Sequence, residues 1–422
     1  MRQDPLSQRI DWVTLLLCGA LALLGWLNIY AAEYDPEIQQ NIFDFSTSAG
    51  KQLVWIGTSI LIAWGIFFLD FRFFDSFALI IYAVLIALLL FVLFTGKEVA
   101  GSRSWFGFAG FGLQPSEFAK FATALALAKY LDHSTKKLSD LKTLSISFVI
   151  ILVPLSLTIL QGDTGTAMVF CALIIPMFRE GLPPLLPIVG AGVVLIFLLT
   201  LMMNQTILLV LISVLILLGL GLNAKQPRKL AWVLIIGLMV IGAVRSVDFV
   251  LTDVLKPHQQ KRVLSLVNPN IDPLGAGWNV TQSKIAIGSG GFWGKGFLQG
   301  TQTKFDFVPA QTTDFIFCTI GEEHGWLGST FLLVLFTAFL LRLVMLAERQ
   351  KSVFSRIYGY GVVAIIFFHF SVNIAMTIGL FPVIGIPLPF FSYGGSSLWA
   401  FTILLFVFLK LDAHRMQVLQ RW

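Results

Sequence analysis

Residues 74–95 read FDSFALIIYAVLIALLLFVLFT, a run of 22 residues that contains a single charged side chain. A helix that crosses the hydrocarbon core of a bilayer needs about 20 consecutive, mostly apolar residues. The run meets this length, so we predict that it is a transmembrane helix.

Similar apolar segments recur along the chain on both sides of this run. We identify twelve candidates: 10–32, 52–70, 74–95, 116–131, 144–160, 164–178, 184–203, 206–222, 230–247, 314–341, 357–381 and 396–411. Several are short or interrupted, and the pattern therefore predicts about 10–12 transmembrane helices. The first segment is too long for the apolar region of a cleavable signal peptide and is predicted to be a span.

The composition agrees with a membrane protein. Of the 422 residues, 57% are hydrophobic and 12% are charged, and the mean hydropathy is +0.84. A soluble domain has about 25% charged residues, so a soluble enzyme, a disordered scaffold and a disulfide-rich secreted protein are excluded. The predicted fold class is an all-α polytopic integral membrane protein.

The basic residues predict how the chain crosses the membrane. They are concentrated in the N-terminal tail, in loops 132–143, 223–229 and 342–356, and in the C-terminal tail. These five segments share one side if the spans alternate, and the positive-inside rule makes that side cytoplasmic. We therefore expect a multi-pass protein of the bacterial inner (cytoplasmic) membrane, surrounded by membrane lipids, with both termini inside. The net charge of +6 is explained in this way, and no nucleic-acid partner is predicted.

The large loop between residues 248 and 313 departs from this pattern. It contains six basic residues: Lys256, Lys261, Arg262, Lys284, Lys295 and Lys304. Long loops are translocated largely regardless of their charge, so we predict that the loop is extracytoplasmic. Its length indicates a functional segment. It is not a nucleotide-binding P-loop, because Ser289 stands where the motif needs glycine.

Neither the cysteines nor the histidines form a recognisable site. The three cysteines lack a CxxC partner and the five histidines lack metal-ligand spacing. The sequence predicts no disulfide, no zinc site and no organic cofactor.

Four blocks of polar and glycine residues stand out between the apolar segments. They are GSRSW (101–105) with QPSEFAK (114–120), RVLSLVNPNIDPLGAGW (262–278) with QSKIAIGSGGFWGKG (282–296), QTTDFIFCTIGEEHGWLG (311–328), and residues 373–397, which end in FSYGGSS. By spacing alone, the glycine-rich block could equally be a turn that only packs against the membrane face. Together the blocks resemble the SEDS family (shape, elongation, division and sporulation), and most closely its rod-elongation member.

The resemblance covers most of the chain and implies its domain organisation. Residues 1–422 would form a single SEDS-type membrane domain with a catalytic loop at 248–313. The family usually has ten spans, so residues 206–247 are predicted to be an inserted helix pair. Trp278 also stands where the family commonly has tyrosine.

The resemblance implies a peptidoglycan glycosyltransferase that polymerises lipid II into β-1,4-linked glycan strands for cell-wall elongation and rod shape. One inverting displacement of the polyprenyl diphosphate requires a base at the acceptor hydroxyl. Asp272 matches the family's essential aspartate and is the predicted catalytic base in an extracytoplasmic active site. From the residues alone, Asp272 before Pro273 could instead be only a turn former.

Three cations are candidates for contact with the diphosphate: Arg103, Lys120 and Lys284. Arg103 could otherwise be an interfacial residue that only reaches toward water. Lys120 lies three residues after Glu117, so the alternative to a functional role is that the two residues simply form an ion pair with each other. Ionisable residues within a span are usually functional, which favours a functional role for the pair. Further candidate substrate-binding residues are Trp105, Asp163, Gln282, Ser283, Asp314, Glu322, Glu323, Ser392 and Ser396. The acidic members could bind a divalent cation (Mg²⁺ or Mn²⁺), orient basic groups or only cap helices, and Trp105 could stack on a sugar or belong to an aromatic belt.

Two other functions remain open. A lipid II flippase or another transporter would explain the many spans and the charges within them, but no internal repeat is visible, and the polar candidates gather on one face. A purely structural scaffold would leave the basic long loop unexplained. By resemblance, the partners would be lipid II, the growing lipid-linked glycan, a class B penicillin-binding protein (a transpeptidase) and other elongation-complex proteins.

Overall fold

The computed structural model describes residues 9–34, 41–99, 101–108, 111–134, 136–249, 251, 253, 257–265, 275–305 and 307–416. The chain forms two compact units. The larger unit comprises Met1–Leu182 and Thr281–Trp422, and the smaller unit comprises Pro183–Val280.

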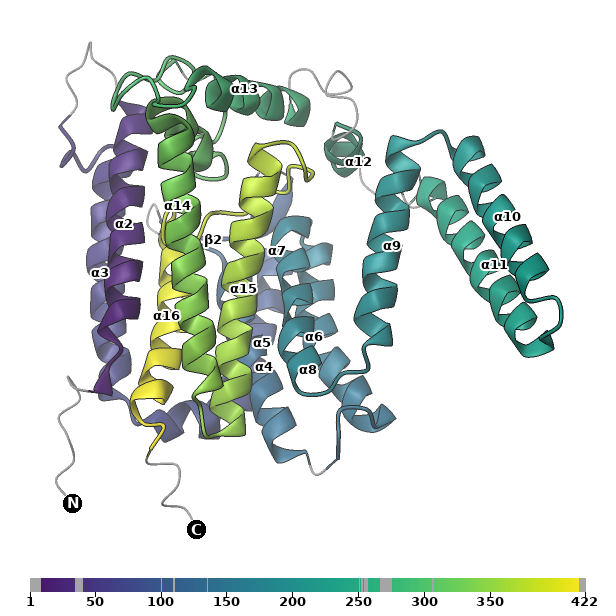
Figure 1. The fold of residues 1–422 in the computed structure, drawn as a ribbon. Helices are drawn as coiled ribbons and strands as arrows, with labels where there is room; N and C mark the ends of the chain where they lie inside the picture. Colours follow the sequence, from purple (N-terminus) through teal and green to yellow (C-terminus); the bar gives the residue numbers. More distant parts are fainter. Residues whose placement is uncertain are drawn as a thin grey trace. The chain divides into compact units, whose positions relative to one another are not determined.

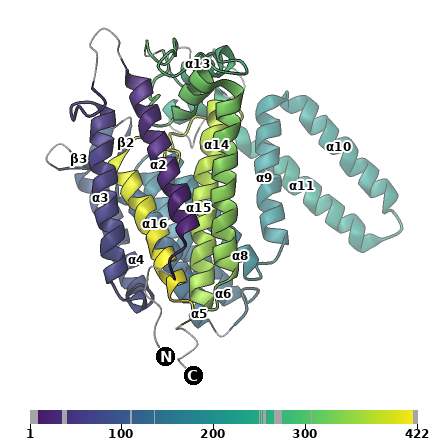
Figure 2. The ribbon, with the colours of Figure 1, turned by 60° about the vertical axis from the view of Figure 1, so that its left-hand side comes forward.

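The larger unit is a bundle of helices that run side by side (Figures 1 and 2). They are α2 (Trp12–Glu33), α3 (Ser48–Phe68), α4 (Phe71–Thr95), α5 (Pro115–His133), α6 (Leu141–Leu160), α7 (Thr164–Val169), the 3₁₀ turn η1 (Phe170–Leu173), α8 (Ile174–Arg179), α14 (Ile316–Glu348), α15 (Val353–Thr377) and α16 (Gly395–Ala413). Helices α15 and α16 are the most deeply buried of the long apolar helices, whereas α4 is largely exposed. Because α5 packs against both α4 and α15, its polar residues lie inside the bundle.

The smaller unit consists of α9 (Leu185–Met202), α10 (Gln205–Leu222), α11 (Pro227–Phe249), α12 (Pro257–Leu264) and the first residues of α13 (Ala276–Ser289). Helix α11 packs against both α9 and α10. The predicted inserted pair, 206–247, therefore forms an antiparallel hairpin of α10 and α11. That it is an insertion remains a prediction, as does the single-domain organisation.

Every one of the twelve predicted apolar segments contains a helix. Among the described helices, nine are long and apolar enough to cross a membrane, and Thr164–Arg179 and Leu185–Leu201 are shorter apolar helices. This confirms the prediction of an all-α, multi-pass membrane protein.

The segment between α4 and α5 forms a small antiparallel sheet. Its strands are β1 (Lys97–Val99), β2 (Ser102–Phe108) and β3 (Phe111–Leu113), in the order β1-β2-β3. Trp105 lies opposite Lys97, and Gly107 lies opposite Gly112. The sheet joins the end of α4 to the start of α5.

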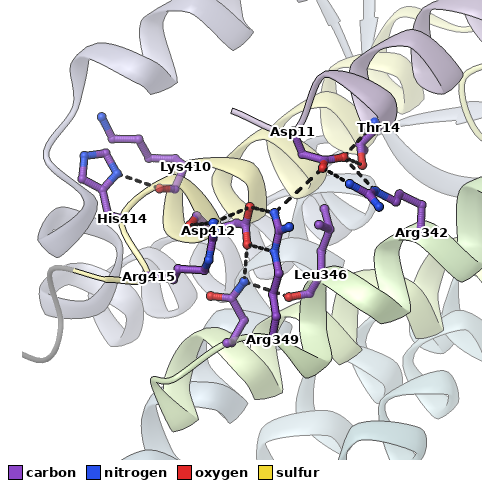
Figure 3. Close-up of polar contacts among 10 residues, drawn as sticks. Asp11, Thr14, Arg342, Leu346, Arg349, Lys410, Asp412, His414 and Arg415 are labelled. Carbon is purple, nitrogen blue, oxygen red and sulfur yellow. Dashed lines mark hydrogen bonds and ion pairs between the residues drawn. The ribbon is translucent and has the colours of Figure 1, made fainter. Parts of the chain in front are cut away.

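An ion cluster of Asp11, Arg342, Arg349 and Asp412 joins three helices at one end of the larger unit (Figure 3). Asp11 caps α2 and pairs with Arg342 of α14. Arg349, at the end of α14, forms a two-pronged pair with Asp412 of α16. These pairs bring together the start of α2, loop 342–356 and the end of α16 at one end of the larger unit. The distribution of basic residues in the sequence predicted that these three segments lie on the same side. Residues 281–305 lie at the opposite end (Figure 1).

Candidate functional site

Lys120 lies at the centre of a buried polar group inside the larger unit. Its ammonium donates to Glu117 Oε2 at 2.8 Å and to His369 Nε2 at 2.8 Å. The side chains of Lys120 and Glu117 are only 2% and 4% exposed, and His369 is fully buried. Glu117 and Lys120 share one face of α5, whereas His369 comes from α15, so the group joins two helices.

Asp163 extends this group toward the end of the bundle that carries the sheet. Its Oδ2 accepts a hydrogen bond of 2.7 Å from Gln114 Nε2, and its Oδ1 caps α7 by accepting from Thr166 N at 3.0 Å. Asp163 also interacts electrostatically with Lys120. We call Gln114, Glu117, Lys120, Asp163 and His369 the polar site.

The backbone before Asp163 explains how the sheet is held over the polar site. Gly162 has φ +86°, a conformation that favours glycine, and a Cβ there would lie 3.0 Å from Gly101 O. Next to it, Arg103 N donates to Gln161 O at 2.8 Å. The strand that carries Arg103 is therefore fixed directly against the turn that carries Asp163.

Arg103 and Trp105 lie on β2. The Arg103 side chain is 53% exposed and faces Glu98 at 3.9 Å, a distance at which an exposed ion pair contributes little. It is thus accessible to a ligand. The Trp105 ring lies against the backbone of Gly112, where a Cβ would come within 2.8 Å of it.

Glu322 forms a second buried acidic site, at the start of α14. Its carboxylate accepts from Lys295 Nζ at 2.6 Å and from three successive backbone amides of residues 301–303 at 2.7, 2.9 and 3.0 Å. The neighbouring Glu323 is 1% exposed, and its Oε2 has no hydrogen-bond partner within the described part of the chain. The arrangement makes Glu322 an anchor for the segment that follows the glycine-rich block.

The glycine-rich block itself packs backbone to backbone on this start of α14. Gly294 has φ +83°, and a Cβ there would lie 2.1 Å from Glu323 O. Lys295 N and Gly296 N donate to the carbonyls of Glu322 and Glu323 at 3.0 and 2.9 Å. These contacts explain the glycine at position 294, because a side chain there would collide with the backbone of α14.

Three of the predicted substrate-binding hydroxyls are bonded to the backbone. Ser283 Oγ donates to Thr377 O at 2.9 Å, Ser392 Oγ to Thr313 O at 2.6 Å, and Ser396 Oγ to Gly112 O at 2.7 Å. These hydroxyls connect neighbouring segments of the bundle, and their role in substrate binding remains a prediction.

The other predicted residues are spread around the end of the bundle that carries the sheet. On α13, Gln282 is half-buried and Lys284 is exposed. Asp314 is half-buried, and its carbonyl accepts from Asn373 Nδ2 at 2.8 Å. Asp272 lies outside the described residues. Within those that are described, no group of three or more His, Cys, Asp or Glu side chains could hold a metal ion, so the divalent cation remains a prediction.

The sequence reasoning missed His369 and Gln114 as members of the site. His369 gave a usable signal, because an ionisable residue inside an apolar span is a functional candidate by default. Gln114 lies in a quoted block, but its contact with Asp163 depends on how α5 and α7 pack.

Comparison with known proteins assigns the family. The FtsW/RodA/SpoVE model, described as "Cell cycle protein", matches residues 11–203 and 175–417. The chain is 34% identical to the peptidoglycan glycosyltransferase RodA of Treponema pallidum, over 96% of this chain and 98% of that protein. It is 33% identical to the peptidoglycan glycosyltransferase MrdB of Escherichia coli K12, over 82% of this chain and 80% of that protein.

Solved structures agree with this assignment. A structure concerning the coordination of polymerization and crosslinking by a peptidoglycan synthase complex matches with a TM-score of 0.70 and 27% identity, over 97% of this chain and 99% of that chain. An aspartate-to-alanine mutant of Thermus thermophilus rod shape determining protein RodA matches with a TM-score of 0.64 and 25% identity, over 96% of this chain and 98% of that chain. With its helical bundle and its family blocks in place, the chain belongs to the FtsW/RodA/SpoVE family, the SEDS family.

Proposed function

We propose that this protein is a peptidoglycan glycosyltransferase of the rod-elongation type, which polymerises lipid II. The observation that carries the proposal is the likeness over nearly the whole chain to a protein named as such a glycosyltransferase, at 34% identity. The polar site and the exposed Arg103 supply charged groups that suit a diphosphate substrate.

The proposed reaction is a single displacement at the anomeric carbon. The donor sugar is α-linked to a polyprenyl diphosphate, and the acceptor 4-hydroxyl oxygen attacks C1 from the opposite face. A new C1–O bond forms with β configuration while the bond to the diphosphate breaks, and the diphosphate leaves with the bonding electrons. The Asp272 carboxylate takes the hydroxyl proton as general base.

The leaving group needs cations rather than a strong acid, because diphosphate departs as a stable anion. Arg103 is half exposed on β2, which is fixed over the turn before Asp163, and we assign it the first contact with the diphosphate. Lys120 is buried in the polar site, so a phosphate oxygen reaches its ammonium only once the ligand has entered the bundle. A divalent Mg²⁺ or Mn²⁺ ion would supply further positive charge on the diphosphate when bound.

The proposed membrane orientation follows from charge. The end of the larger unit that carries the ion cluster also carries the start of α2, the basic loop 342–356 and the end of α16, and the positive-inside rule assigns this end to the cytoplasm. The active site would then face the outside of the inner membrane. A class B penicillin-binding protein is the proposed partner, and the structural likeness to a peptidoglycan synthase complex supports it.

A lipid II flippase is the second candidate, and the buried charges of the polar site favour it, since transporters place such groups between helices. Purified protein, with and without the penicillin-binding partner, should be given lipid II in detergent, and the glycan products separated by gel electrophoresis. The glycosyltransferase proposal predicts polymer of many disaccharide units. A protein that moves lipid II across vesicle membranes and makes no polymer would be a flippase.

A further inference from the structure

His369 is a buried ionisable residue in the middle of α15 that the proposed reaction leaves without a role. Its side chain is fully buried and bridges two segments far apart in the sequence. Nε2 meets Lys120 Nζ of α5 at 2.8 Å, and Nδ1 meets Pro387 O, in the segment between α15 and α16, at 3.1 Å.

The two partners fix the tautomer of the ring. A carbonyl oxygen only accepts hydrogen bonds, so Nδ1 must carry the proton that is donated to Pro387. An ammonium only donates, so Nε2 must present its lone pair to Lys120. His369 is therefore the neutral Nδ1–H tautomer, and the contact with Pro387 is what keeps the acceptor turned toward the lysine.

The surroundings of Lys120 show what this acceptor does. Two of its three N–H groups are held, one by Glu117 on the same helix and one by His369 on another. The remaining side of the ammonium faces the Phe401 ring, with Nζ 5.2 Å from the ring centroid. A cation–π contact at this distance is much weaker than a bond to a phosphate oxygen, so a phosphate can replace it while the other two bonds persist.

Phe401 is itself ordered by the same histidine, since the two rings meet edge to face at 4.9 Å. Without His369, the hydrogen bond to Glu117 would be the one side-chain hydrogen bond left to the ammonium among the described residues. We propose that His369 is a positioning residue that, as a neutral acceptor, holds the Lys120 ammonium with its third N–H directed at the diphosphate of the lipid-linked substrate. The inference rests on the proposed function and assigns to it one further residue.

Two isosteric amides separate the acceptor from the rest of the ring. In His369→Gln the amide oxygen reaches the position of Nε2, whereas in His369→Asn the amide reaches only the position of Nδ1 and leaves Lys120 without its second acceptor. We expect His369→Asn to lower kcat for lipid II polymerisation about 10–100-fold, the usual effect of one charge-assisted hydrogen bond. His369→Gln should stay within about threefold of the wild type, and KM should change little in either variant. Equal activity of the two variants would overturn the proposal.

A second comparison tests whether the effect passes through Lys120. In a Lys120→Met background, His369→Asn should cause no further loss, because the group that it positions is absent. The same loss in both backgrounds would show a structural role instead. His414→Asn is the matched control, since His414 Nδ1 also bonds a backbone carbonyl, Lys410 O at 2.9 Å, but has no lysine partner in the polar site. It should leave kcat unchanged.

These outcomes separate the inference from the function on which it rests. Wild-type protein that makes no glycan would refute the proposed function. Full activity of Lys120→Met would refute the role of the lysine and, with it, the inference. An inactive Lys120→Met protein beside a fully active His369→Asn protein would refute the inference alone.

Discussion

Asp11 allows the ion cluster to be tested by pH. Burial by itself raises the pKa of the Asp11 carboxyl, but hydrogen bonds from the Arg342 guanidinium and from Thr14 outweigh it and lower the pKa from 3.8 to about 2. A depressed pKa in the folded state stabilises the protein above the unfolded-state pKa, near 4. This stabilisation is lost as the pH falls from about 4 through about 2.

The size of the effect follows from the shift. The shift from 3.8 to about 2 is about 1.8 units, which corresponds to at most about 2.4 kcal/mol at neutral pH, since one unit is about 1.36 kcal/mol. The Arg342 side chain is 31% exposed, so solvent screening reduces the expected contribution to about 1–2 kcal/mol. Asp11→Asn removes the charge and should lower the free energy of unfolding by that amount at pH 7.

Thermal unfolding in detergent, followed by tryptophan fluorescence between pH 7 and pH 2, measures this. We expect Asp11→Asn to unfold about 2–4 °C below the wild type at pH 7, and the difference to fall to a small part of this near pH 2, where half of the wild-type carboxyl is protonated. Glu98→Gln is the control, because its exposed pair with Arg103 at 3.9 Å should contribute almost nothing. A difference between Asp11→Asn and wild type that stays constant from pH 7 to pH 2 would refute the reasoning.

Three further predictions concern the site and the topology. Arg103→Ala and Lys120→Ala should each lower lipid II turnover about 10²–10³-fold with the protein still folded; unchanged turnover in either would remove that residue from the diphosphate site. Glu322→Gln should speed hydrogen exchange of the three backbone amides that the carboxylate binds by at least about tenfold, and unchanged exchange would argue against the anchor. A cysteine at Asn270 should react with an impermeant maleimide from outside, whereas one at Ala224 should not; the reverse pattern would invert the topology.

The sequence predicts the helical architecture well because the bilayer imposes a length and a composition on each span. Each of the twelve apolar segments, from residues 10–32 to 396–411, contains a helix. The charge pattern likewise predicted that loop 342–356 lies at the same end of the larger unit as the start of α2 and the end of α16, and the pairs Asp11–Arg342 and Arg349–Asp412 agree with this. These features depend on local composition, which the sequence displays directly.

The site depends on tertiary packing and was predicted only in part. Glu117, Lys120 and Asp163 were identified, and the structure brings them together. His369 was missed because the histidines were searched for metal-ligand spacing, whereas its partner is 249 residues away on another helix. A serine such as Ser392 looks the same in a motif whether it binds a ligand or braces the backbone, and only its bond to Thr313 O shows the bracing.

The most direct test of the central claim is glycan polymerisation by Asp272→Asn. Asparagine preserves the size and turn propensity of the residue but cannot take the proton of the acceptor hydroxyl. We expect polymerisation of lipid II to fall by at least about 10²-fold, as expected for the loss of a general base, while lipid II binding persists because the diphosphate contacts remain. An Asp272→Asn protein that still makes long glycan strands at the wild-type rate would contradict the account.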